Sequence, residues 1–105
     1  MNSKNIKFTV ICKLGKQIKT TYSHWEKIIT VKHPIVKDKE KEVEKTLTDP
    51  IEIRVSKTDN QVYLYYCDFE GNFFAVVSKH LNDDGYIITC YITDWIKEGR
   101  IIWKK

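Results

Sequence analysis

The stretch GYIITCYITDW, residues 85–95, decides the fold because its apolar and polar side chains alternate. Successive side chains of a β-strand point to opposite faces of a sheet. One face is mostly apolar and would carry Tyr86, Ile88, Cys90 and Ile92. The other face holds three hydroxyls in a row and would carry Ile87, Thr89, Tyr91 and Thr93. The pattern predicts a strand that packs one face on a core, while its polar face is either ordinary solvated surface or the floor of a site.

Three further strand patterns precede this stretch. Residues 51–56 (IEIRVS) alternate apolar and polar, and residues 61–69 (QVYLYYCDF) and 73–79 (FFAVVSK) are rich in β-branched and aromatic residues,. The segments TDN, EGN and HLNDDG between the strands consist largely of turn-forming residues,. Four consecutive strands joined by short turns predict an antiparallel meander.

Two helices are predicted before the meander. Ser23 and Glu26 have the spacing of a capping box, so we expect a helix over residues 24–31 that ends before Pro34,. The next segment, residues 34–50 (PIVKDKEKEVEKTLTDP), is rich in good helix formers and carries a narrow apolar stripe,. Because proline suits the first turn of a helix, this segment predicts a second helix that packs by one edge.

The two ends of the chain complete the predicted fold. Residues 6–22 are expected to form a β-hairpin, and residues 100–103 a last short strand,. The fold class is therefore α+β, with an N-terminal hairpin and two helices packed on one face of a four-stranded antiparallel sheet. We expect a single domain, residues 1–105, in which residues 1–22 form a hairpin extension and residues 23–105 the core.

Composition narrows the class of protein. No apolar run is long enough to span a membrane and the N-terminus lacks the pattern of a signal peptide, which predicts a soluble, cytoplasmic protein,. The formal net charge of +4 is uneven: residues 1–45 hold eleven lysines against five acids. This basic half favours a nucleic-acid partner weakly. The three cysteines are far apart and suit buried thiols better than disulfides or a zinc site: Cys12, Cys67 and Cys90,.

A series of short motifs resembles a known superfamily. The order is HW..I...HP, a charged helix ending TL.DP, then I...S, YLYY, VVSK, GYIITCYIT and a terminal G..IW, spanning roughly residues 24–103. This series is similar to a phage- and mobile-element-associated branch of the barnase, EndoU, colicin and RelE-like (BECR) nucleases. The resemblance implies N-terminal helices packed on a four-stranded antiparallel sheet. It also implies metal-independent RNA cleavage of a toxin or phage-defence type, with no cofactor. The hairpin of residues 6–22 lies outside it.

Cleavage of this kind uses the ribose 2′-hydroxyl as nucleophile, so the protein must supply a base, an acid and positive charge near the phosphate. His33 is the leading base or acid, and the His-Pro motif of the resemblance supports it,. Arg54 can bind phosphate and stabilise charge, and Ser56 shares its side of the strand. Thr89 and Tyr91 are expected to position the substrate from the same open face, although their distance from Arg54 depends on the strand order.

RNA binding is predicted for three further residues. Tyr63 and Tyr65 are expected on the open face, where they can stack on the bases of tRNA or another single-stranded RNA, and Lys79 can reach a phosphate,. His24 and His80 are weaker candidates for proton transfer. Each of these residues also has an ordinary structural explanation. The alternative function is a catalytically inactive protein-interaction or regulatory module, and a cognate antitoxin or immunity protein is a candidate partner.

Overall fold

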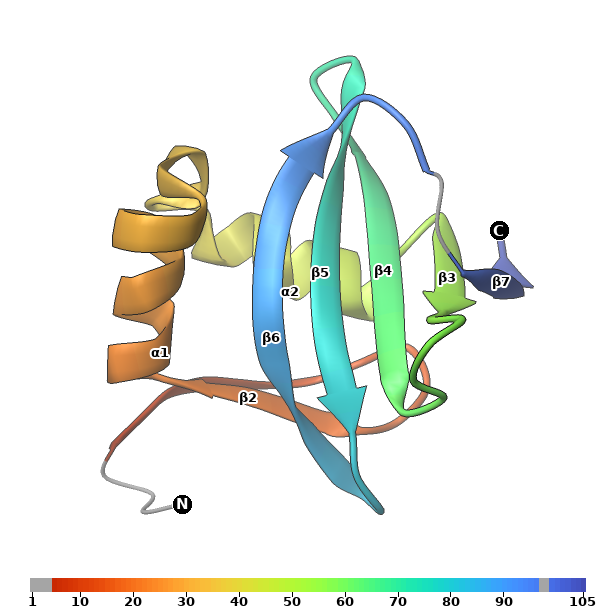
Figure 1. The fold of residues 1–105 in the computed structure, drawn as a ribbon, viewed down its shortest axis with the longest axis horizontal. Helices are drawn as coiled ribbons and strands as arrows, with labels where there is room; N and C mark the ends of the chain where they lie inside the picture. Colours follow the sequence, from red (N-terminus) through yellow and green to blue (C-terminus); the bar gives the residue numbers. More distant parts are fainter. Residues whose placement is uncertain (1–4, 97–98) are drawn as a thin grey trace.

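The computed structural model describes residues 5–96 and 99–105, which form an α+β fold around a single mixed sheet (Figure 1). Within these residues the sheet has seven strands in the order β1-β2-β6-β5-β4-β3-β7. The strands are β1 (Ile6–Ile11), β2 (Gln17–Thr21), β3 (Glu52–Val55), β4 (Val62–Phe69), β5 (Asn72–His80), β6 (Asp84–Thr93) and β7 (Arg100–Lys104). The prediction of a four-stranded antiparallel sheet is therefore wrong.

The predicted meander is present, but it is only the middle of the sheet. Strands β3, β4, β5 and β6 pair antiparallel in chain order. The predicted hairpin, β1 and β2, extends this sheet because residues 17–19 of β2 pair in parallel with residues 84–86 of β6. At the other edge β7 pairs antiparallel with β3. Hydrophobic alternation predicts which face of a strand is buried, but it does not identify the partner of a short strand, so the extension was missed.

The helices differ from the predicted ones at their ends. Helix α1 (Tyr22–Lys27) is capped by Thr21, whose Oγ1 accepts a hydrogen bond of 3.1 Å from the His24 amide, so the predicted cap at Ser23 is wrong. Helix α1 continues as a π-helical turn, η2 (Ile28–Lys32).

The second predicted helix is interrupted. Pro34 begins a short 3₁₀ turn, η3 (Pro34–Val36), and only then does α2 (Glu40–Thr48) form. Between them Asp38 adopts a φ of 64°, a left-handed conformation that aspartate tolerates better than most residues and that a helix does not contain,. The break lets the chain turn from α1 to cross the sheet.

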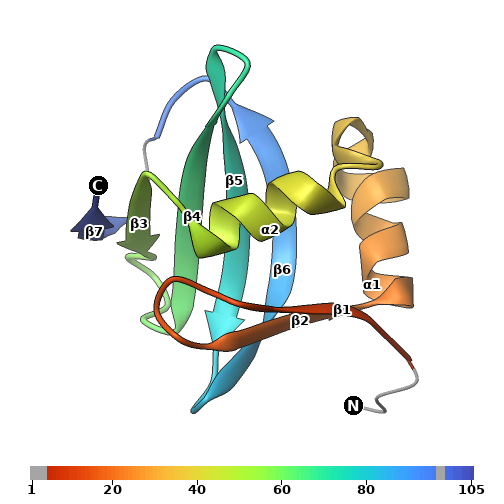
Figure 2. The ribbon, with the colours of Figure 1, turned by 180° about the vertical axis from the view of Figure 1, so that it is seen from behind.

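The main core lies between one face of the sheet, the helices and the hairpin. Figure 2 shows α2 crossing the strands on this face, with the β1–β2 hairpin on the same side. Fully buried side chains from all of these elements meet there, among them Ile18, Ile28, Leu47, Phe74 and Cys90. The three cysteines are buried and free, as predicted. The hairpin thus contributes to the main core.

A β-bulge in β6 corrects the predicted faces of the opening stretch. Ile87 pairs with Ser78, and Thr89 pairs with the preceding residue of β5, Val77, so Ile88 is an extra residue without a partner,. The bulge turns Ile87 into the main core rather than onto the hydroxyl face. Beyond it the predicted alternation holds, because Cys90 is in the main core and Tyr91 packs on the opposite face.

Gly85 lies in the part of β6 that pairs with strands on both sides, with Ile18 of β2 and with His80 of β5. A Cβ atom at this position would lie 2.3 Å from the Lys79 carbonyl oxygen. We expect Gly85→Ala to lower the free energy of unfolding by about 2 kcal/mol, measured by urea denaturation, because backbone must shift to relieve the clash.

Gly71 provides the control for this prediction. It has a φ of 82° and nothing within 4 Å of a built Cβ, and asparagine tolerates that conformation,. Gly71→Asn should change stability by less than about 0.5 kcal/mol. Equal losses at the two glycines would contradict the close approach at Gly85.

Candidate functional site

The structure brings two of the predicted site residues together, His33 and Tyr91. Their ring centroids are 5.5 Å apart and the rings are tilted by 40°. His33 lies where η2 ends, and its amide donates a hydrogen bond of 2.7 Å to the Ile28 carbonyl. Since the residue before a proline avoids the helical region, Pro34 turns the backbone at His33 out of the helix, to φ −141° and ψ 76°,. The helix end thereby holds the imidazole beside the hydroxyl face of β6.

The position of α1 and η2 beside β6 follows from the short pairing of β2. Pairing with β2 ends at Tyr86, and the chain then turns into α1, which runs alongside the rest of β6 (Figure 1). His24 Nε2 lies 2.9 Å from the carbonyl oxygen of the bulged residue Ile88. A carbonyl oxygen only accepts, so Nε2 carries the hydrogen in this bond. His24 therefore satisfies a backbone group that the strand pairing leaves open.

Thr89 lies two residues before Tyr91 on the same face of β6,. Its Oγ1 is buried and has no hydrogen-bond partner among the described residues. The ladder also places Thr89 level with Arg54, through Val77 and Leu64. The predicted sharing of one face by Arg54 and Thr89 is therefore confirmed.

Arg54 does not reach this region. Three strand spacings separate β3 from β6, which puts the two backbones about 14 Å apart. The Arg54 guanidinium forms an ion pair with Glu52, and its Nη1 lies 3.5 Å from the Gly99 carbonyl oxygen. Both side chains of the pair are largely buried. The charge of Arg54 is thus balanced within β3, and the structure does not bring it together with His33.

Ser56 lies at a different end of the molecule. It follows β3, and its amide donates to the Val62 carbonyl at 2.8 Å. Its hydroxyl accepts from the Thr58 amide at 3.2 Å. Ser56 therefore shapes the turn between β3 and β4, and it is not near Tyr91.

The predicted placement of Tyr63 and Tyr65 on the open face is wrong. Tyr65 is fully buried in the main core, and Tyr63 packs against it. The reason is that β4 is apolar or aromatic on both sides, so alternation alone does not show which side faces the helices. Leu64 and Tyr66 instead face the other way, in a smaller cluster with Ala75.

Tyr65 and His80 form a buried polar group inside the core. Tyr65 Oη lies 3.0 Å from Cys12 Sγ and 3.0 Å from His80 Nε2, and Tyr63 stacks on the His80 ring at 3.8 Å. Burial raises the pKa of Tyr65 far above its usual value and lowers the pKa of His80 to about 4. These groups are enclosed, so neither is placed to meet a large ligand such as RNA.

Lys79 is bound to Asp59 at the β3–β4 turn. Their Nζ and Oδ2 atoms are 2.7 Å apart, and this hydrogen bond raises the pKa of Lys79 and lowers that of Asp59. In the ladder Lys79 lies beside Tyr86, whereas Tyr91 pairs with Ala75, four residues earlier in β5. The structure therefore separates Lys79 from the His33–Tyr91 pair.

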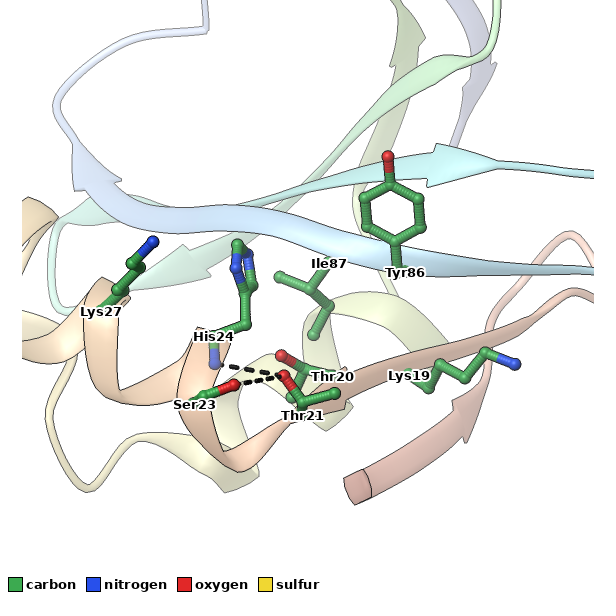
Figure 3. A pocket seen from close by; sticks show the side chains of 8 residues that line it. All are labelled: Lys19, Thr20, Thr21, Ser23, His24, Lys27, Tyr86 and Ile87. Carbon is green, nitrogen blue, oxygen red and sulfur yellow. Dashed lines mark hydrogen bonds between the residues drawn. The ribbon is translucent and has the colours of Figure 1, made fainter. Parts of the chain in front are cut away.

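A cavity of about 420 Å³ lies where β2 and β6 diverge, beside α1 (Figure 3). The described residues that line it include no carboxylate; they are Lys19, Thr20, Thr21, Ser23, His24, Lys27, Tyr86 and Ile87. Sequence reasoning missed Lys19, Lys27 and Tyr86. One signal was present, because Lys27 follows His24 by three residues and so shares its helix face.

Two further properties concern the whole described part of the chain. Across residues 5–96 and 99–105, no three His, Cys, Asp or Glu side chains are grouped so as to hold a metal ion. No helix in the same residues has both the length and the apolar character needed to cross a membrane.

Comparison with known proteins leaves the family open. No family model matches the sequence, and no curated protein or solved structure is significantly similar to it. The resemblance to BECR nucleases therefore stays a prediction.

Proposed function

We propose that this chain is a cytoplasmic domain of BECR type that binds single-stranded RNA and cleaves it without a metal ion. The observation that carries the proposal is the contact between His33 and Tyr91, whose ring centroids lie 5.5 Å apart beside the polar face of β6. Both residues are partly exposed, which leaves them within reach of a substrate.

The chemistry asked of these residues is limited. The ribose 2′-oxygen forms a bond to the adjacent phosphorus as the bond from phosphorus to the 5′-oxygen breaks. A base must take the 2′-hydroxyl proton, and an acid must give a proton to the 5′-oxygen. Histidine exchanges protons near neutral pH, which suits His33 to one of these roles. The hydroxyl of Tyr91 can position the phosphate by a hydrogen bond, whereas the Thr89 hydroxyl is buried.

Positive charge for the phosphate comes from the helix side rather than from Arg54. Lys27 and Lys32 are exposed in the α1 and η2 segment that borders β6. Lysine binds phosphate as a point charge. The basic N-terminal half of the chain thus borders the proposed site.

The test is cleavage of matched RNA and DNA strands in EDTA. We expect the purified protein to cut a single-stranded RNA and to leave the DNA strand of the same sequence intact, because DNA lacks the 2′-hydroxyl. Gel analysis of end-labelled strands measures both. Equal cleavage of the two strands, or cleavage that needs added metal, would contradict the proposed chemistry.

A second candidate function is a catalytically inactive protein-interaction or regulatory module. It is favoured by two exposed apolar side chains on either side of His33, Val31 at 77% and Ile35 at 64% exposure. Absence of RNA cleavage together with a stoichiometric protein partner on purification would favour this module over the nuclease.

A further inference from the structure

We propose that the cavity between β2, α1 and β6 binds the phosphate group of a ribonucleotide. The nucleotide is either free or part of an RNA strand. The proposal goes beyond cleavage at His33 and does not depend on it: the cavity shares Lys27 with the proposed cleavage site, but its lining does not include His33 or Tyr91.

The size of the cavity suits a nucleotide. Pairing of β2 with β6 ends at Lys19 and Tyr86, and the two segments then part as β2 leads into α1. The space they leave, about 420 Å³, is within the range of small-molecule sites,. Ile87, which lines the cavity, is four residues before Tyr91 on β6. The cavity therefore lies about 13 Å along the strand from the proposed cleavage site.

The charge of the lining favours an anion. Lys19 is already paired with Asp84 at 2.9 Å, which leaves Lys27 as the main cation for a ligand. Lys27 is exposed and forms no ion pair with any described residue. Figure 3 shows the side chains of Lys27 and His24 both directed from α1 toward β6. A phosphate beside them would gain a charge-assisted hydrogen bond.

A buried hydroxyl provides an independent sign of a missing partner. Thr20 lines the cavity, is only 1% exposed, and its Oγ1 has no hydrogen-bond partner among the described residues. Figure 3 shows this hydroxyl on the side of Thr20 that faces Ser23 and His24. An unpaired buried hydroxyl destabilises a fold, and a phosphate oxygen would supply the acceptor that it lacks.

The rest of the lining accommodates the remainder of a nucleotide. Tyr86 is 37% exposed and stands on β6 next to the buried Ile87. A tyrosine ring can stack on a base, whereas the fully buried Ile87 only closes the cavity on the core side. The hydroxyl of Ser23 is hydrogen-bonded to Thr21 at 3.3 Å, and a hydroxyl can accept one bond while it donates another,.

Titration calorimetry with 5′-AMP and with inorganic phosphate tests the site. We expect Lys27→Ala to weaken 5′-AMP binding about tenfold, the usual effect of one charged hydrogen bond. Lys41→Ala is the matched control, because Lys41 is an exposed helical lysine on α2 that does not line the cavity. The absence of binding by both probes, or equal weakening by the two variants, would overturn the proposal.

Thr20→Val separates a ligand contact from a structural one. Valine has nearly the same shape but no hydroxyl, so we expect a higher melting temperature for the free protein and several-fold weaker 5′-AMP binding. A lower melting temperature with unchanged 5′-AMP affinity would overturn the role of Thr20. If this variant does not fold, 5′-AMP binding by Lys27→Ala still tests the proposal, because Lys27 is exposed.

A 2′-deoxy hexanucleotide distinguishes the two sources of the phosphate, because it cannot be cleaved through a 2′-hydroxyl. Competition between this strand and 5′-AMP indicates a subsite for a nucleic-acid chain, whereas 5′-AMP binding without competition indicates a free nucleotide. Both results support a phosphate site. If the wild-type protein binds 5′-AMP but does not cleave RNA, the nuclease proposal alone is rejected. If it cleaves RNA but does not bind 5′-AMP or inorganic phosphate, this inference alone is rejected.

Discussion

At pH 4 the protein is expected to have lost about 3 kcal/mol of its stability at pH 7 through one buried histidine, His80,. The ring of His80 is 5% exposed and stacks on Tyr63. Its Nε2 lies 3.0 Å from the hydroxyl of Tyr65, which is itself bound to Cys12. None of these three neighbours is a carboxylate that could stabilise an imidazolium.

The direction of the effect follows from the two pKa values. Burial first, and then the nearby charge of Lys16, lower the pKa of His80 from 6.5 to about 4 in the fold. The unfolded chain therefore binds a proton at His80 more readily than the folded chain does. The stability that His80 contributes is complete above pH 6.5 and is lost as the pH falls from there toward 4,.

Urea denaturation of the wild type and His80→Phe at pH 7 and pH 4 measures this contribution. Phenylalanine keeps an aromatic ring on Tyr63 but binds no proton, so we expect the variant to lose about 3 kcal/mol less than the wild type between the two pH values. The difference between the two proteins removes the effect of the carboxylates, which titrate in both. An unchanged acid sensitivity in His80→Phe would contradict a neutral, buried His80.

The local elements of the fold were predictable because their signals are local. The alternation in β3 and β6, and the turn residues between the strands, place the meander correctly. The hairpin and the final strand were also predicted. Their joining to the meander was not, since β2 and β6 pair through only three residues each, 17–19 with 84–86, and these segments are far apart in the sequence. No pattern within either segment names the other as its partner.

The candidate site was predictable only in part, for two physical reasons. The first is the bulge at Ile88, which inserts one residue into β6 and reverses the faces of the residues before it,. The second is that β4 presents aromatic rings on both faces, so Tyr65 could be assigned to the core only once α2 and the hairpin were seen to cover that face. Tyr91 follows the bulge in β6, and His33 lies outside the sheet. Neither the bulge nor the two aromatic faces of β4 therefore affects the predicted place of either residue.

The separation of Arg54 from His33 has a consequence for the mechanism. A predicted constellation of His33 and Arg54 around one phosphate would need the sheet to bring β3 next to β6, whereas β4 and β5 lie between them. The Arg54 guanidinium also forms an ion pair with the Glu52 carboxylate, which neutralises its charge. Phosphate binding is therefore expected on the helix side of β6, where Lys27 and Lys32 are exposed.

The largest effect on activity is expected from His33. If the protein cleaves RNA as proposed, His33→Ala should slow cleavage about 100- to 10,000-fold, the usual contribution of a group that transfers a proton in the transition state. RNA binding should remain, because the lysines along α1 and η2 are unchanged. Tyr91→Phe removes only a positioning hydroxyl, so a smaller loss of about tenfold is expected.

Single-turnover cleavage and RNA binding, measured on the same preparations, separate catalysis from folding and affinity. Lys37→Ala is the matched control, since Lys37 is exposed at the end of the turn that begins at Pro34. This variant shows whether any substitution near the turn reduces the cleavage rate. Equal losses in His33→Ala and Lys37→Ala would mean that the turn acts only as structure. A full rate in His33→Ala would remove proton transfer by His33 from the proposed mechanism. The other described histidines are not placed to replace it, because His24 is bound to the Ile88 carbonyl and His80 is buried in the core.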